Sequence, residues 1–150
     1  MRVLSTAVSL AEHDGFLQPA MRSMELFAGL TDEQRLKIIY FMKVLEFDAE
    51  EIVITQGDEE GGDFYVIYTG QVVAHTEGLF RGRVMGVLGP GEFFGELALL
   101  LDRPRSATVQ CVEKTCCFVF SRSDLQSLME RYPAIADTIK QVARERYDKL

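Results

Sequence analysis

Short runs of β-branched and aromatic residues, separated by turns that contain glycine, fill the middle of the chain from about residue 52 to residue 120. The run DFYVIYTGQVVAH reads as two strands around Gly70, and GRVMGVLGPGEFFGE holds another strand that is broken at Gly89-Pro90-Gly91. About seven or eight such strands follow one another at intervals of roughly 8–12 residues, which is typical of a β-sandwich or a β-barrel. This spacing predicts a fold that is mainly β.

Helical patterns flank this β-region on both sides. The stretch TDEQ, which begins at Thr31, is a capping-box signal and predicts a helix over about residues 32–43. The stretch SRSD, which begins at Ser121, is a second capping signal ahead of the helical pattern LQSLMERY. Pro133 suits the first turn of a last helix. The 150 residues are expected to form one domain, with helices before and after the strands.

Residues 1–25 precede the recognisable patterns. Their apolar residues, in MRVLSTAVSLAEH, suit a helix that packs on a neighbouring element. A weak signal peptide is the alternative, and the Ser and Thr residues that interrupt the apolar stretch favour the helix. We therefore expect an N-terminal helical segment over residues 1–25, which packs on the sheet or mediates a dimer. No run approaches the roughly 20 apolar residues that cross a bilayer, so no membrane contact by this chain is expected.

Charge and cysteine content restrict the partners and the compartment. The net charge of −7 argues against nucleic acid as a partner, because phosphate backbones require a basic face. The three cysteines, Cys111, Cys116 and Cys117, are an odd number and a poor disulfide framework. We expect reduced thiols and a cytoplasmic protein. In TCCFVF, the alternate residues Cys116, Phe118 and Phe120 share one face of a strand, which is expected to face the core.

The sequence does not show the patterns of catalytic or metal-binding residues that would indicate an enzyme. GPGEFFGE faintly resembles a metal motif of double-stranded β-helix enzymes, but such sites cluster histidines, and His13 and His75 are the only two here. The cysteine spacing does not match a zinc site, and no G-x-S-x-G elbow is present. The chain is expected to be neither a metalloprotein nor an enzyme.

The stretch FGELALLLDRPRSATV, residues 94–109, concentrates groups that suit a sugar phosphate. Gly95 lets a ligand approach the backbone, and the N–H groups at the start of a short helix near Glu96 favour an anion. Arg105 supplies a planar fork of donors for phosphate oxygens, and Ser106 and Ala107 add a hydroxyl and an N–H group. Because a carboxylate repels phosphate, Glu96 would bind a ribose hydroxyl instead. The alternative is a surface salt bridge between Glu96 and Arg105, which would contribute little.

This stretch resembles the phosphate-binding cassette of cyclic nucleotide-binding domains, and the resemblance extends over residues 24–150. LFAGLTDEQ, Gly57, Gly70 and the helix after Pro133 also stand where the family pattern has them. The resemblance implies a double-stranded β-helix, or jelly-roll, barrel of about eight strands with N-terminal helices and two C-terminal helices. It implies a cyclic nucleotide-binding domain over residues 26–150, after the N-terminal segment.

The family's binding roles carry over to individual residues of this chain. Glu96 would hold the ribose 2′-hydroxyl and Arg105 the cyclic phosphate, while a shell around the phosphate would come from Gly95, Leu97, Ala98, Ser106 and Ala107. The base would lie against the strand around Val84–Val87 and be covered by the last helix, from which Arg144, Arg146 or Tyr147 would touch it. Ser106 bears on the choice of nucleotide, and we favour cAMP over cGMP as the ligand.

The resemblance implies a sensor in which nucleotide binding moves or orders the C-terminal helices. Its alternatives stay open at this point. The chain is a sensor by itself or the sensor part of a larger transcription regulator, ion channel or kinase regulatory subunit, or it is a domain that has lost its ligand. Its protein partner would be a second copy of the chain or an effector that the sequence does not identify.

Overall fold

The computed structural model describes residues 1–5, 10–58, 62–76, 83–99 and 104–146. Within these ranges the strands are β1 (Arg2–Ser5), β2 (Lys43–Phe47), β3 (Ile52–Ile54), β4 (Phe64–Thr69), β5 (Val72–Thr76), β6 (Arg83–Leu88), β7 (Phe93–Phe94), β8 (Thr108–Cys111) and β9 (Thr115–Phe120). The helices are α1 (Leu10–Arg22), α2 (Glu25–Ala28), α3 (Asp32–Ile39), the 3-10 helix η1 (Glu96–Leu99), α4 (Arg122–Arg131) and α5 (Pro133–Arg146).

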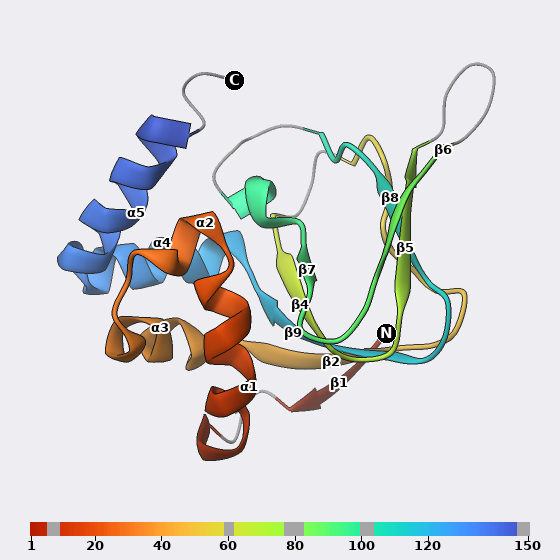
Figure 1. Cartoon of the computed structure of the whole chain (residues 1–150), viewed down its shortest axis with the longest axis horizontal. Coiled ribbons are helices and arrows are strands. Elements are labelled where there is room, and N and C mark those ends of the chain that lie inside the picture. The colour runs from red at the N-terminus through yellow and green to blue at the C-terminus, as the bar shows by residue number, and fades with distance from the viewer. Residues whose placement is uncertain (6–9, 59–61, 77–82, 100–103, 147–150) are drawn as a thin grey trace.

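The strands form two antiparallel sheets that pack face to face. One sheet has the order β1-β2-β9-β4-β7, and the other has the order β3-β8-β5-β6. Figure 1 shows the helices gathered at one side of the molecule and the four-stranded sheet at the other. This arrangement confirms the predicted jelly-roll class, with helices before the strands and two helices after them.

The five-stranded sheet is the middle layer, so its strands are apolar on both faces. In β9, Phe118 and Phe120 point toward the helices, while Cys117 and Val119 point toward the other sheet, as their separate packing clusters show. We call these the helix-side cluster, which includes Leu26, Phe27, Phe64, Leu99, Phe118, Phe120, Ile135 and Ile139, and the inter-sheet cluster, which includes Leu45, Phe47, Ile54, Tyr65, Ile67, Val109, Cys117 and Val119. The predicted core face of β9 is therefore confirmed, and a second core lies behind it.

The capping signals lie where the sequence predicts them. The Thr31 hydroxyl accepts the N–H of Gln34 at 3.1 Å, and the Gln34 side chain accepts the N–H of Thr31 at 3.0 Å. The Ser121 hydroxyl likewise accepts the N–H of Asp124 at 3.0 Å at the start of α4. The helix predicted over residues 32–43 is shorter than expected, because Lys43 already pairs with Val119 in the sheet.

The first residues of the chain differ from the prediction of a helix. Residues 2–5 form β1, whose Val3 pairs with Leu45 of β2, and Arg2 Nη2 contacts Glu46 Oε1 at 2.5 Å. Pairing with the exposed edge of β2 is a long-range interaction that local hydrophobic periodicity does not reveal. The helix begins at Leu10, and the apolar residues between lie in positions 6–9, outside the described residues.

The C-terminal helices follow the predicted pattern. Pro133 is the first residue of α5, and Ile135 and Ile139 are buried in the helix-side cluster. The three cysteines are free thiols, and Cys111 and Cys117 are buried. Among the helices that the structure describes, none combines the length and apolar character that crossing a membrane requires.

Candidate functional site

Gly95 joins β7 to η1 in a backbone conformation that favours glycine. Its φ is +84°, and a Cβ placed there would lie 2.8 Å from the carbonyl oxygen of Asp63 and 3.0 Å from Nη1 of Arg105. A side chain at this position would therefore collide with backbone as well as meet a strained conformation. The structure thus brings together two residues that the sequence singled out, Gly95 and Arg105, and adds Asp63 as a third.

Arg105 is anchored through both its backbone and its side chain. Its N–H donates to the carbonyl of Asp58 at 2.9 Å, and its own carbonyl accepts the N–H of Gly57 at 2.8 Å. The side-chain Nη2 donates to the carbonyl of Asp63, just before β4, at 2.8 Å. These contacts tie Arg105 to the turn after β3 and to the start of β4, and between described residues no hydrogen bond engages its other guanidinium nitrogens.

The surroundings of Arg105 are partly desolvated. Burial lowers the pKa of the Arg105 guanidinium, whereas Tyr65 and Asp63 raise it. Burial raises the pKa of the Asp63 carboxyl against the effect of Arg105, and burial raises the pKa of Tyr65 to about 12. The Tyr65 ring stacks on Phe94 with centroids 4.9 Å apart. A phosphate placed here would meet a cation that water screens only in part.

Glu96 is the first residue of η1, and its half-buried carboxylate turns toward the helices. Its Oε1 accepts the backbone N–H of Leu26, in α2, at 3.1 Å. Burial raises the pKa of Glu96, the Leu26 N–H lowers it, and Glu25 raises it further. Within the described part of the chain, no ion pair or hydrogen bond joins Glu96 to Arg105. The salt bridge considered as an alternative is not formed.

The remaining predicted cassette residues belong to the two segments that contain Gly95 and Arg105. Leu97 and Ala98 lie in η1, and their side chains are outside the described residues. Ser106 is exposed and Ala107 is half-buried in the segment that leads into β8. These residues stand beside Glu96 and Arg105 along the chain, and no hydrogen bond between described residues joins the Ser106 hydroxyl to either group.

The residues predicted to contact the base lie in two distant parts of the molecule. Val84 and Val87 belong to β6, where Val87 is 53% exposed and the side chain of Val84 is outside the described residues. Arg144 is exposed on α5, at the opposite side of the molecule from β6 in Figure 1. The side chain of Arg146 and the whole of Tyr147 lie outside the described residues. In this structure α5 packs on the other helices and does not cover β6, so contact with a base there would require α5 to move.

The two histidines lie in different elements, and His75 pairs with Val84 of β6 and with Thr108 of β8. His13, in α1, packs edge-on against Tyr68 and Phe118, with centroids 5.3 and 4.9 Å away. His75 lies in β5. Across the described ranges, no three His, Cys, Asp or Glu side chains gather as a set of metal ligands.

Sequence reasoning missed two groups that the structure connects to the site. Asp63, the last residue before β4, provides the carbonyl that holds Arg105. The position of Asp63 at the start of a strong strand pattern was the sequence signal that could have identified it. The backbone N–H of Leu26, which holds Glu96, carries no sequence signal, because every residue except proline has this group.

A model of the cyclic nucleotide-binding domain family matches residues 44–132, a span that holds β2 to β9 and the whole cassette. The chain belongs to this family. The matched family is that of domains that bind cyclic nucleotides.

Two curated relatives and one solved structure illustrate the range of the family. The chain is 31% identical over 112 residues to the cAMP-dependent protein kinase regulatory subunit of Dictyostelium discoideum, covering 72% of this chain and 34% of that protein. It is 32% identical over 127 residues to cGMP-dependent protein kinase 2 of Homo sapiens, covering 76% of this chain and 16% of that protein. The crystal structure of the N-terminal domain of a transcriptional regulator from Streptomyces coelicolor superposes with a TM-score of 0.76 and 28% identity, covering 87% of this chain and 91% of that one.

The chain spans only part of the curated relatives that it matches, with coverages of 29%, 34% and 16% for three of them.

Proposed function

We propose that the chain is a cyclic nucleotide sensor that binds cAMP in preference to cGMP, in a cassette around Gly95, Glu96 and Arg105. The observation that carries the proposal is the packing of the Arg105 guanidinium against the side-chain-free face of Gly95, 3.0 Å from the position of a Cβ. In the proposed site, a ligand would reach both the arginine and the backbone that begins η1.

The phosphate would bind to Arg105. The guanidinium is half-buried and held by the Asp63 carbonyl, so its orientation is fixed before the ligand arrives. A hydrogen bond to a charged group is worth roughly 1.5–3 kcal/mol, and a bidentate guanidinium pair adds geometric selectivity. In the proposed site Gly95, Leu97 and Ala98 contribute backbone groups, and Ser106 and Ala107 complete the phosphate shell from the other segment.

The ribose would bind to Glu96 and the base to β6. A carboxylate accepts hydrogen bonds from a sugar hydroxyl, whereas it would repel the phosphate. The exposed Val87 gives the base an apolar surface on β6. For α5 to cover the base and bring Arg144 to it, nucleotide binding must favour a closed arrangement of α4 and α5 over the one in Figure 1.

The preference for cAMP rests on the family resemblance of the PRSATV segment. The relatives named above as cAMP-dependent and cGMP-dependent proteins are similar to this chain to nearly the same degree, 31% and 32%, and so favour neither nucleotide. We further propose that an effector protein or a second copy of the chain reads the position of α4 and α5. The free cysteines fit a cytoplasmic location.

Isothermal titration of the chain with cAMP, cGMP and 5′-AMP tests the proposal. We expect binding of cAMP, weaker binding of cGMP, and little binding of 5′-AMP, whose open phosphate has a different shape and charge. Arg105→Ala should weaken cAMP binding at least about tenfold, because it removes the charge-assisted contact. The matched control Arg22→Ala, at an exposed arginine that ends α1, should bind as the wild type does. Absence of heat with every nucleotide would refute the sensor function.

A further inference from the structure

Helix α2 is a single turn whose position depends on its surroundings. The N–H groups of Phe27 and Ala28 donate to the carbonyl of its N-cap residue, Met24, at 3.0 and 2.8 Å. One turn of helix is not stable alone, because nucleation fixes several dihedral angles for few hydrogen bonds. The N-cap residue Met24 provides no side-chain cap, and the N–H of Leu26 is instead bound by Glu96 at 3.1 Å.

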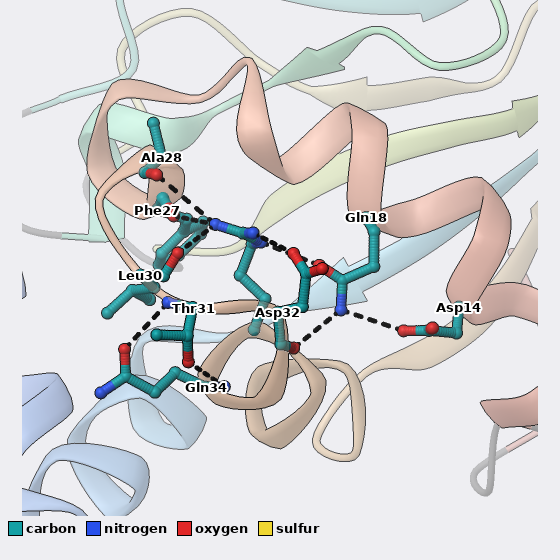
Figure 2. A network of polar contacts seen from close by, with 9 residues as sticks. Asp14, Gln18, Phe27, Ala28, Leu30, Thr31, Asp32 and Gln34 are labelled. Carbon is teal, nitrogen blue, oxygen red and sulfur yellow. Dashed lines mark hydrogen bonds and ion pairs between the residues drawn. The ribbon is translucent and has the colours of Figure 1, made fainter.

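A buried arginine, Arg35, holds the other end of α2. Its guanidinium contacts backbone carbonyls at and just after the end of α2 and the side chains of Gln18 and Asp32, partners that Figure 2 labels. Its Nη1 donates to the carbonyl of Leu30 at 2.5 Å and to that of Phe27 at 3.2 Å. Its Nε donates to Gln18 Oε1 at 2.8 Å, and its Nη2 forms an ion pair with Asp32.

The Arg35 side chain is 4% exposed, which is unusual for an arginine. Burying a guanidinium is costly unless its donors are satisfied, and here helices α1, α2 and α3 all provide acceptors. Gln18 is itself fixed, because its Nε2 donates to Asp14 Oδ1 at 3.0 Å and to the carbonyl of Asp32 at 2.9 Å. The network therefore determines where α2 sits relative to the rest of the protein.

This geometry links Arg35 to the proposed ribose group. Arg35 binds the carbonyl of Phe27, and the preceding residue, Leu26, presents the N–H that holds Oε1 of Glu96. Among the described residues, the other carboxylate oxygen has no hydrogen-bond partner, so it can accept a hydroxyl. A carboxylate held by one oxygen has lost much of its rotational freedom before it meets the ligand.

We propose that Arg35 is a positioning residue for ribose recognition: it fixes α2 so that the Leu26 N–H orients the Glu96 carboxylate toward the 2′-hydroxyl. This inference rests on the proposed function. Arg35 touches neither the sugar nor the phosphate, and it acts through the backbone of α2. Its contribution should therefore appear in the recognition of the 2′-hydroxyl and be absent from the recognition of the phosphate by Arg105.

The test compares affinities for cAMP and 2′-deoxy-cAMP, measured by calorimetry on the full chain. The wild type should prefer cAMP by about tenfold or more, the effect expected of a hydroxyl bound to a carboxylate. Arg35→Lys keeps the charge but loses the planar fork, and should reduce this preference to about threefold or less. Affinity for 2′-deoxy-cAMP should stay within about twofold, and Glu96→Ala should abolish the preference.

Two further variants separate positioning from general destabilisation. Gln18→Met removes the partner of Arg35 Nε while keeping a side chain of similar length, and should reduce the preference in the same direction, even if Arg35→Lys does not fold. Ile54→Val weakens the inter-sheet cluster, far from α2, and should leave the preference unchanged. A full tenfold preference in folded Arg35→Lys or Gln18→Met would overturn the inference, and so would a wild type that binds both nucleotides equally.

A measurement without nucleotide distinguishes this inference from the proposed function. Amide hydrogen exchange at Leu26 should be faster in Glu96→Ala and in Arg35→Lys than in the wild type, because each variant loosens one end of α2. If exchange accelerates but no cyclic nucleotide binds, the positioning network is real and the sensor function is wrong. If exchange at Leu26 is unchanged in both variants, Arg35 does not position Glu96.

Discussion

Glu96 and Arg105 belong to one continuous cassette, yet they are held by different halves of the molecule. Arg105 is bound by the turn at Gly57 and Asp58 and by the carbonyl of Asp63, all of which border strands. Glu96 is bound by the backbone of α2. The same division continues in the apolar contacts: Leu99, at the end of η1, packs in the helix-side cluster, whereas Val109, shortly after Arg105, packs in the inter-sheet cluster.

The difference indicates separate tasks for the two groups. β4, which follows Asp63, and β8, which follows Arg105, are each paired on both sides, so Arg105 provides a fixed point for a phosphate. Helix α2 lies between η1 and α5 in Figure 1, and Gly29, just after α2, approaches Thr138 of α5, where an added Cβ would lie 3.7 Å from the threonine methyl group. A ligand that binds both groups at once would therefore connect the sheets to the helices that the proposed sensor moves.

Gly95→Ala changes the residue that lies beside Glu96 and packs against Arg105, and it should have the largest effect on stability. The new Cβ would meet the Asp63 carbonyl at 2.8 Å with φ at +84°. We expect a loss of about 3 kcal/mol in the free energy of unfolding, from backbone strain and from displacement of Asp63. Urea denaturation followed by circular dichroism measures this change.

Gly91→Ala is the matched control for that variant. Gly91 has the same φ of +84°, but a Cβ there would have no atom within 4 Å. Its loss should be only the conformational cost, about 1–2 kcal/mol. Equal losses of unfolding free energy in the two variants would show that the Asp63 carbonyl does not crowd Gly95. The close packing of Arg105 and Asp63 on Gly95 would then not require the absence of a side chain there.

Glu96→Gln should change stability and cAMP affinity in opposite directions. Glutamine keeps an oxygen for the Leu26 N–H but has no charge to desolvate. At neutral pH we expect the free energy of unfolding to rise, because the partly desolvated charge of the wild-type carboxylate is removed, while cAMP affinity falls. Denaturation and calorimetry on the same samples measure both. A loss of stability with retained affinity would contradict the assignment of Glu96 to the ribose.

The pH dependence of this gain has a definite sign. Because burial raises the pKa of Glu96, the folded protein binds its proton more tightly than the unfolded chain does. The wild-type carboxylate therefore lowers stability as pH rises above the unfolded pKa, and the full cost is present above the folded pKa. The advantage of Glu96→Gln should be complete at neutral pH and should vanish as pH falls below the unfolded value of 4.5.

The elements that local patterns specify were predicted well. The strands around Gly70, the caps at Thr31 and Ser121, and the start of α5 at Pro133 each depend on residues close in sequence. β1 was mistaken for helix, because its strand form depends on β2, about 40 residues later. Long-range pairing of this kind leaves little trace in the spacing of apolar residues.

For the candidate site, side-chain identities were predictable and backbone partners were not. Gly95, Glu96 and Arg105 were chosen for chemistry that their side chains carry. Their actual holders are the carbonyl of Asp63 and the N–H of Leu26, groups that any residue could supply at the right place in the fold. The position of α5 away from β6 likewise depends on how whole helices pack, which no local motif encodes.

Ser106→Ala should have the smallest effect of these variants. It tests which nucleotide the segment around Arg105 prefers. Ser106 is exposed just after Arg105, so its hydroxyl would make a solvent-accessible hydrogen bond. If that bond goes to guanine, affinity for cGMP should fall about threefold and affinity for cAMP should stay within twofold, since such bonds are worth roughly 0.5–1.5 kcal/mol. Competition between the two nucleotides measures the ratio, with Ser127→Ala, exposed on α4, as the control. An equal loss for both nucleotides would instead assign the hydroxyl to the phosphate, because the phosphate is the part that they share.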